Sequence, residues 1–199
     1  MQTPTSSFGL IERFKRGDQS AFTQLFEKYR GRLAVLIHYK LSPELRASME
    51  VDDLLQETFL AAAEDIQRFD YRAPGSFYAW LARIAGNVVA DAARYQGRQK
   101  RHPEELVRFR SASNPGGPEP ADSETPSRIL AIKENMGRLR AKLDELPEEM
   151  QRVILLAKFE GLTTREVAER LGKSREATAL LLHRALKRFR QAAGEEPRQ

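Results

Sequence analysis

The sequence contains no cysteine among its 199 residues. Disulfide bonds, thiolate catalysis and cysteine-based zinc sites are therefore excluded. No hydrophobic run approaches the roughly 20 residues that a helix needs to cross a bilayer. The amino terminus, MQTPTSSFGL, lacks the basic start and apolar core of a signal peptide. These absences predict a cytoplasmic protein with no membrane partner.

Recognisable catalytic patterns are also missing. The three histidines, His38, His102 and His183, fall in separate segments, and there is no G-x-S-x-G motif or phosphate loop. Catalysis needs groups that converge on one point, so we do not expect an enzyme or a cofactor. The Asp-Asp-x-x-x-Glu spacing that begins at Asp52 is compatible with a hard-metal site, but no second cluster of ligands accompanies it. We therefore expect no metal.

The spacing of apolar residues predicts an all-α protein, because it follows the helical period and no segment alternates like a strand. Residues 102–128 hold five of the ten prolines and the pair Gly116-Gly117, which predicts a flexible linker. We expect two small helical domains, at residues 8–101 and 129–191. The second is predicted to contain a helix-turn-helix.

That motif is predicted at residues 160–190, EGLTTREVAERLGKSREATALLLHRALKRFR. Thr163 or Thr164 can cap its first helix, Gly172 supplies the bend, and Ser174 caps the second helix. Six basic residues and one acid, Glu176, lie between residues 173 and 190. In a helix-turn-helix the second helix usually enters the DNA major groove. The charge balance agrees with that function.

A helical wheel divides this second helix into an inner and an outer side. The inner side comprises Ala177, Thr178, Leu181, Leu182, Ala185 and Phe189. On the outer side, Arg175 can pair with guanine and Glu176 with cytosine, while the other cations suit phosphates. The candidate duplex contacts are Lys173, Ser174, Arg175, Glu176, Ala179, Leu180, His183, Arg184, Lys187 and Arg188.

The net charge changes sign between two neighbouring segments of the first domain. Residues 44–70 carry eight acids and two arginines, whereas residues 83–101 carry five basic residues and one acid. In the first segment, the four residues Asp52, Asp53, Gln56 and Glu57 lie mostly off the apolar stripe. This asymmetry suggests two different macromolecular surfaces on one small domain.

Three motifs in this order resemble a bacterial sigma factor of the extracytoplasmic-function (ECF) type. The most specific is DDLLQETF at residues 52–59. FYAWLARIAGN at residues 77–87, followed by Asp91, is similar to the family's promoter-melting segment. LDELP at residues 143–147, with the helix-turn-helix after it, is similar to its fourth region. The resemblance covers about residues 19–101 and 140–190.

The resemblance implies binding to core RNA polymerase and to promoter DNA. Asp52, Asp53, Gln56 and Glu57 would dock on a basic coiled-coil element of the polymerase, where complementary charge favours a fast, oriented encounter. The linker would thread across the active-site cleft. The helix-turn-helix would bind the minus-thirty-five element as duplex DNA.

The minus-ten element would be bound as unpaired bases of the melted strand. Asn87 is the best candidate for a base edge, because its amide both donates and accepts hydrogen bonds. Trp80 is either a stacking platform or a core anchor, and Tyr71 and Tyr78 are equally ambiguous. The candidate minus-ten contacts are Tyr71, Ser76, Trp80, Arg83, Asn87, Arg94, Arg98, Lys100 and Arg101.

The sequence departs from the family pattern in the second helix of the motif. Many members carry Lys or Arg with Ser where this chain has Ala179-Leu180-Leu181. Leu180 can contact thymine methyl groups, the helix can recognise DNA shape, or this side can face a protein. Two other functions also stay open: a dimeric helix-turn-helix regulator that acts without core polymerase, and a helical interaction protein. An anti-sigma factor is an open partner.

Overall fold

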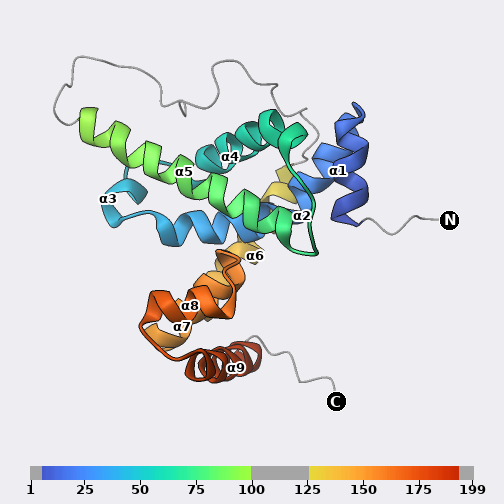
Figure 1. Cartoon of the computed structure of the whole chain (residues 1–199). Helices are drawn as coiled ribbons and strands as arrows, with labels where there is room; N and C mark the ends of the chain where they lie inside the picture. Colours follow the sequence, from blue (N-terminus) through green and yellow to red (C-terminus); the bar gives the residue numbers. More distant parts are fainter. Residues whose placement is uncertain (1–5, 100–125, 193–199) are drawn as a thin grey trace. The chain divides into compact units, whose positions relative to one another are not determined.

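The computed structural model describes residues 6–99 and 126–192, and all regular structure in these two ranges is helical (Figure 1). The predicted all-α class is confirmed. The chain divides into two compact units, residues 1–123 and 124–199. The predicted linker at residues 102–128 lies mostly outside the described residues. Helix α6 begins inside it, at Pro126 rather than Ile129.

The first unit is built around its second helix. Helix α2 packs against α1, α4 and α5, and α4 also packs against α5. A short helix, α3, follows α2 and was not predicted, because four residues carry too little periodicity. The elements are α1 (Ser7–Lys15), α2 (Gln19–Lys40), α3 (Pro43–Arg46), α4 (Val51–Asp65), the 3-10 turn η1 (Ile66–Arg68) and α5 (Ser76–Gln99).

The apolar stripe predicted on α4 forms part of this core. Leu54, Leu55 and Phe59 are buried, and the Phe59 ring lies 4.5 Å from the Phe26 ring and 6.2 Å from the Phe22 ring of α2. Full burial of one such side chain stabilises the fold by about 1.5–3 kcal/mol. The core therefore fixes which side of α4 faces water.

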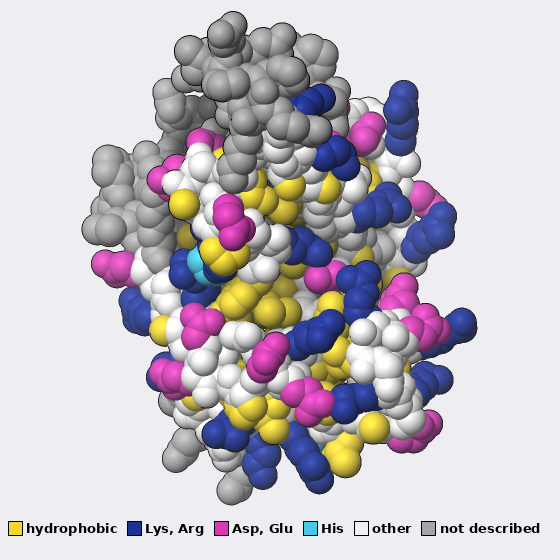
Figure 2. Space-filling view, turned by 90° about the vertical axis from the view of Figure 1, so that its left-hand side faces the viewer, with side chains coloured by type: hydrophobic (Ala, Val, Ile, Leu, Met, Phe, Trp, Pro, Cys, Tyr) yellow, Lys and Arg dark blue, Asp and Glu magenta, His cyan; other side chains and the backbone are white. Residues whose placement is uncertain are grey.

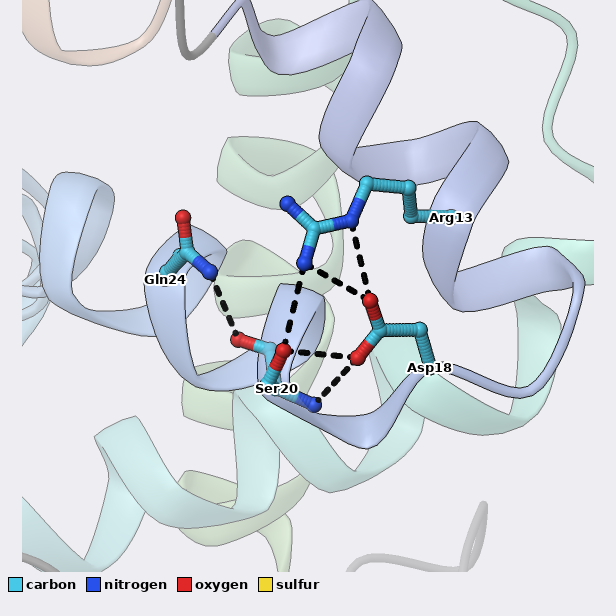
Figure 3. A network of polar contacts seen from close by, with 4 residues as sticks. All are labelled: Arg13, Asp18, Ser20 and Gln24. Carbon is cyan, nitrogen blue, oxygen red and sulfur yellow. Dashed lines mark hydrogen bonds and ion pairs between the residues drawn. The ribbon is translucent and has the colours of Figure 1, made fainter. Parts of the chain in front are cut away.

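A polar network fixes the corner between α1 and α2 (Figure 3). Arg13 donates from Nε and Nη2 to Asp18 Oδ2 at 2.9 and 2.7 Å. Asp18 caps α2 through Ser20 N, and Gln24 Nε2 donates to the Ser20 carbonyl at 3.3 Å. Hydrogen bonds from Ser20 and Arg13 lower the pKa of the Asp18 carboxyl. These charge-assisted contacts thus fix the angle at which α2 follows α1.

The second unit packs its final helix against α6, α7 and α8. Leu143, Val153, Val167 and Ala185 are fully buried and bring residues from these four helices into one core. Helix α7 ends in a π-turn that the sequence did not predict. The elements are α6 (Pro126–Asp144), α7 (Glu148–Ile154), the π-turn η2 (Leu155–Phe159), α8 (Thr164–Leu171) and α9 (Arg175–Ala192).

The surface carries charges of both signs. Figure 2 shows one face, on which Lys and Arg side chains alternate with Asp and Glu and the hydrophobic side chains form separate patches between them. None of the described helices is long and apolar enough to span a membrane. Because charges of both signs are mixed on this face, the charge pattern alone does not mark a binding surface there.

Candidate polymerase and nucleic-acid interfaces

The acidic face of α4 consists of Asp52, Asp53, Gln56 and Glu57. Asp53 and Gln56 are exposed, whereas Asp52 and Glu57 are half-buried. Both aspartates lie in the first turn of α4, where carboxylates interact favourably with the helix dipole. The four residues thus share one side of the helix, as predicted, and the core packing of α4 keeps that side towards solvent.

The 69–75 loop joins η1 to α5 and precedes the predicted promoter-melting helix. Phe69 is buried at its start, and Gly75 has a φ of 92°, which a residue with a side chain rarely adopts. Ser76, a candidate minus-ten contact, is the first residue of α5, and its amide donates to the Ala73 carbonyl at 3.0 Å. The loop therefore has a defined path between two anchored ends.

Four of the candidate minus-ten contacts form a polar stripe along α5. Arg83, Asn87, Arg94 and Arg98 are all exposed. On the other side of α5, Leu81, Ala85, Val88 and Ala92 are buried. Lys100 and Arg101, the remaining predicted phosphate contacts, lie outside the described residues.

One cation of this stripe already has an acidic partner. The Arg94 guanidinium forms an ion pair with Asp91, three positions earlier on α5. A phosphate that binds Arg94 has to compete with this carboxylate or share the guanidinium with it.

The aromatic candidates at the start of α5 have different surroundings. Trp80 is half-buried, and its ring lies 4.8 Å from the Phe69 ring and 5.5 Å from the Phe77 ring. Tyr78 is buried, with the Arg32 guanidinium 3.3 Å from its ring centre. Burial lowers the pKa of Arg32, and the nearby tyrosines oppose that shift. Tyr78 is therefore a core residue, and Tyr71 and Trp80 remain as the half-buried candidates.

The turn between α8 and α9 is fixed at both helix ends. Thr163 Oγ1 accepts a hydrogen bond from Glu166 N at 3.3 Å, and Glu166 Oε2 accepts one from Thr163 N at 2.7 Å, which forms a capping box. Gly172 ends α8 with a φ of 63°. Ser174 Oγ accepts from Ala177 N at 3.1 Å and caps α9. The capping residues chosen from the sequence occupy these positions.

The side of α9 predicted to face outward is exposed. Leu180, in the middle of this side, is 51% exposed. The outward residues are Arg175, Glu176, Ala179, Leu180, His183 and Lys187, and Arg184 and Arg188 beside them are exposed as well.

One inward assignment on α9 was wrong. Ala177 is exposed, because it lies in the first turn of the helix, where Thr178 takes the buried position and donates from Oγ1 to the Ser174 carbonyl at 2.9 Å. The helical-wheel prediction assumed that the same side of α9 is buried along the whole length of the helix.

Contacts far apart in the sequence were not predicted. Lys173 Nζ lies 2.7 Å from Glu149 Oε1 of α7, so a candidate phosphate contact also ties the turn to another helix. Lys15 Nζ donates to the Phe69 carbonyl at 2.7 Å, and Gln67 Nε2 donates to the Lys15 carbonyl at 3.2 Å. No periodic or charge signal in the sequence distinguishes these residues from other surface residues.

The capping box predicts an acid-sensitive start of α8. Hydrogen bonds from the Thr163 side chain and amide lower the pKa of Glu166. The ionised Glu166 carboxylate therefore stabilises the folded protein fully above the usual glutamate pKa of about 4.3. This stabilisation is lost as the pH falls through the lowered pKa that Glu166 has in the folded protein. We expect Thr163→Ala to destabilise α8 by about 1 kcal/mol. Glu166→Ala should remove the part of this stabilisation that depends on pH.

Two measurements check this prediction. An NMR titration of the Thr163 amide should follow the Glu166 carboxylate, and hydrogen exchange should show faster opening of α8 in both variants at neutral pH. Glu169→Ala is the matched control, because Glu169 pairs with the exposed Arg165 across one turn, at 3.0 Å, and takes no part in the capping box. Equal exchange in all three variants would contradict a role for the box.

The described residues contain no group of three or more His, Asp and Glu side chains placed to hold a metal ion. The candidate residues lie on three parts of the described surface: the acidic face of α4, the polar stripe of α5 beside the 69–75 loop, and the exposed side of α9.

Comparison with known proteins identifies the family. A family model described as ECF sigma factor matches residues 5–195. The chain is 32% identical over 161 residues to the ECF RNA polymerase sigma-E factor of Haemophilus influenzae, with 80% of each chain covered. It is 30% identical over 186 residues to the RNA polymerase sigma factor CarQ of Myxococcus xanthus, with 93% of this chain and 96% of the relative covered.

Among solved structures, CnrH in complex with the cytosolic domain of CnrY is 24% identical to this chain, with a TM-score of 0.44. The alignment covers 98% of this chain and 100% of CnrH. The family model, which extends over nearly all of the sequence, decides the assignment: the chain belongs to the ECF sigma factors, which bind core RNA polymerase and direct transcription from promoters.

Proposed function

We propose that this sigma factor docks on core RNA polymerase through the acidic face of α4 and binds promoter DNA through two further surfaces. The observation that carries the proposal is the reversal of charge between the acidic face of α4 and the polar stripe of α5. Both include exposed residues and lie on helices whose apolar sides share one core. Opposite charges suit a basic protein element and a polyanion respectively. We also propose that the protein acts in the cytoplasm.

In this proposal, the single-stranded minus-ten element lies along the 69–75 loop and the polar stripe of α5. Asn87 contacts a base edge, because its amide can donate and accept at once. Arg83, Arg94 and Arg98, with Lys100 and Arg101, hold phosphates. Trp80 contacts Phe69 and Phe77 and so supports the start of the loop.

The exposed side of α9 binds the minus-thirty-five element as duplex DNA. Arg175 and Glu176 lie in the first turn, which is the part of a recognition helix that normally contacts base edges. Leu180 follows one turn later and is placed to contact a thymine methyl group. Lys187 and Arg188 lie further along the helix and suit phosphates. With few polar side chains in the middle of the helix, DNA shape contributes to recognition.

Salt dependence separates phosphate contacts from structural cations. We expect Lys187→Ala to reduce the slope of log affinity against log salt by about 0.9, the value for one phosphate contact. Lys173→Ala should change the slope less, because Glu149 already engages this ammonium. Holoenzyme binding to duplex promoter DNA over a range of salt concentrations measures both. Equal changes of slope would show that Lys173 leaves Glu149 to bind a phosphate.

Run-off transcription with purified core polymerase tests the function as a whole. We expect this chain to join core and to start transcripts from a subset of genomic promoter fragments. If it neither joins core nor starts any transcript, the proposal fails. Footprints on palindromic duplex sites without polymerase would instead favour a dimeric helix-turn-helix regulator. Whether an anti-sigma factor also binds is a separate question, which co-purification from its own cells would answer.

A further inference from the structure

Two large apolar side chains among the described residues are strongly exposed: Leu180 at 51% and Phe8 at 49%. Leu180 belongs to the exposed side of α9. Phe8 lies in the second position of α1 and belongs to none of the surfaces described above. Isolated exposed apolar residues are common on proteins. The surroundings of Phe8 therefore have to show whether it has a function.

Phe8 is the outer end of a row of aromatic rings. Its ring lies 5.2 Å from the Tyr71 ring, and Tyr71 lies 6.5 Å from Phe69. Phe69 in turn lies 4.8 Å from Trp80 at the start of α5. The aromatic row of Phe8, Tyr71, Phe69 and Trp80 thus runs from α1, through the 69–75 loop of the proposed single-strand surface, to the start of α5.

Helix α1 is held firmly against the rest of the unit. Leu10 and Ile11 are buried, and Ser7 Oγ lies 2.5 Å from the Tyr29 hydroxyl oxygen. At the other end, Lys15 Nζ donates to the Phe69 carbonyl, and the Arg13–Asp18 network fixes the corner with α2 (Figure 3). Phe8 is therefore placed in advance beside Tyr71, and no ordering is needed when a ligand arrives.

Cations accompany the ring pair. The Arg68 and Arg72 side chains, on either side of Phe69 and Tyr71 in the sequence, are 89% and 82% exposed. Their partners Asp65 and Asp70 lie at 3.6 and 3.4 Å. Such exposed ion pairs are weak and can yield to a phosphate. A ring pair that is exposed at Phe8, with exposed cations next to Phe69 and Tyr71 in the sequence, fits a nucleotide, which has a flat base and a charged backbone.

We propose that Phe8 and Tyr71 form a stacking position for one unpaired base of the promoter DNA, which extends the single-strand surface onto α1. This inference rests on the proposed function. It adds a contact from a helix outside the three motifs that the sequence singled out. The ligand is an unpaired nucleotide, and any base identity is accepted, because stacking uses the ring face that all bases share.

The test is a coupling measurement on the holoenzyme. Fluorescence anisotropy measures binding to a fork-junction DNA whose single strand carries the minus-ten region of a fragment active in run-off transcription. A series of these DNAs places one abasic nucleotide at each single-stranded position in turn. Phe8→Ala should weaken binding to the intact fork by about tenfold, which is within the range of one base–aromatic stack. At one position, the abasic site should weaken wild type equally and leave Phe8→Ala unaffected.

Controls separate this position from other roles of Phe8. Phe8→Tyr should restore binding, and Trp80 fluorescence should show that Phe8→Ala remains folded. If the effects of Phe8→Ala and the abasic site multiply at every position, Phe8 contacts no base and the inference fails. Weaker binding of Phe8→Ala to core polymerase without DNA would also overturn it and place this surface at a protein contact. Absence of any run-off transcript would remove the proposed function and this inference together.

Discussion

The double substitution Asp53→Lys/Glu57→Lys should abolish detectable holoenzyme formation, with a loss of at least about 100-fold in affinity for core polymerase. Both residues lie on the acidic face of α4, one turn apart. Reversing them replaces attraction to a basic element with repulsion, and like charges facing one another across an interface cost several kcal/mol. Affinity is measured by anisotropy of a labelled sigma factor titrated with core polymerase.

A control with the same change in net charge isolates the site from long-range effects. Glu12→Lys/Asp65→Lys alters one acid on α1 and one at the end of α4, on a different side of that helix. We expect it to bind core within a few-fold of wild type, because general attraction between exposed charges is largely screened at physiological salt. Equal losses in the two double variants would mean that net charge, rather than the acidic face, controls docking.

Phe59→Ala should destabilise the first unit by about 3–5 kcal/mol, the usual cost of emptying a buried phenylalanine site. Phe59 is 2% exposed and contacts the rings of two phenylalanines on α2. It lies behind the acidic face and anchors α4 to α2. Because small domains are stable by only about 5–15 kcal/mol, this variant should lose much of its folded population on mild heating, and core binding with it.

Trp80 is the only tryptophan in the sequence, so its fluorescence during urea unfolding reports on the first unit alone. Phe8→Ala serves as the control, because it removes the same ring from a half-exposed position. We expect its unfolding midpoint to stay close to wild type, while that of Phe59→Ala falls clearly. Similar midpoints for both variants would show that α4 is held by other contacts than the Phe59 ring.

The long helices could be predicted because their periodicity extends over several turns. The polar stripe of α5, from Arg83 to Arg98, repeats over four turns, so an error of one residue at either end does not move it to another side. The start of α9 offers no such redundancy. Ala177 was misplaced there because one turn of helix beside a tight bend packs differently from the turns that follow.

Contacts between distant residues could not be predicted by the same means. Periodicity shows which side of a helix is buried, but not which neighbour it meets. The pairing of Lys173 with Glu149, and the hydrogen bond from Lys15 to the Phe69 carbonyl, depend on how helices and loops are placed in space. The sequence also left Tyr78 and Trp80 undecided. Trp80 falls at the edge between the two sides of α5, and the burial of Tyr78 follows from the packing of its neighbours in space.

The π-turn at Leu155–Phe159 has a consequence for the length of the chain. In an uninterrupted α-helix, Ile154 and Phe159 would lie about 140° apart around the axis. The wider turn accommodates an additional residue, and both side chains are buried. Insertion or deletion of one residue here would change a single helical turn and leave α8 and α9 intact. Alignments of relatives should therefore allow a one-residue gap at this position.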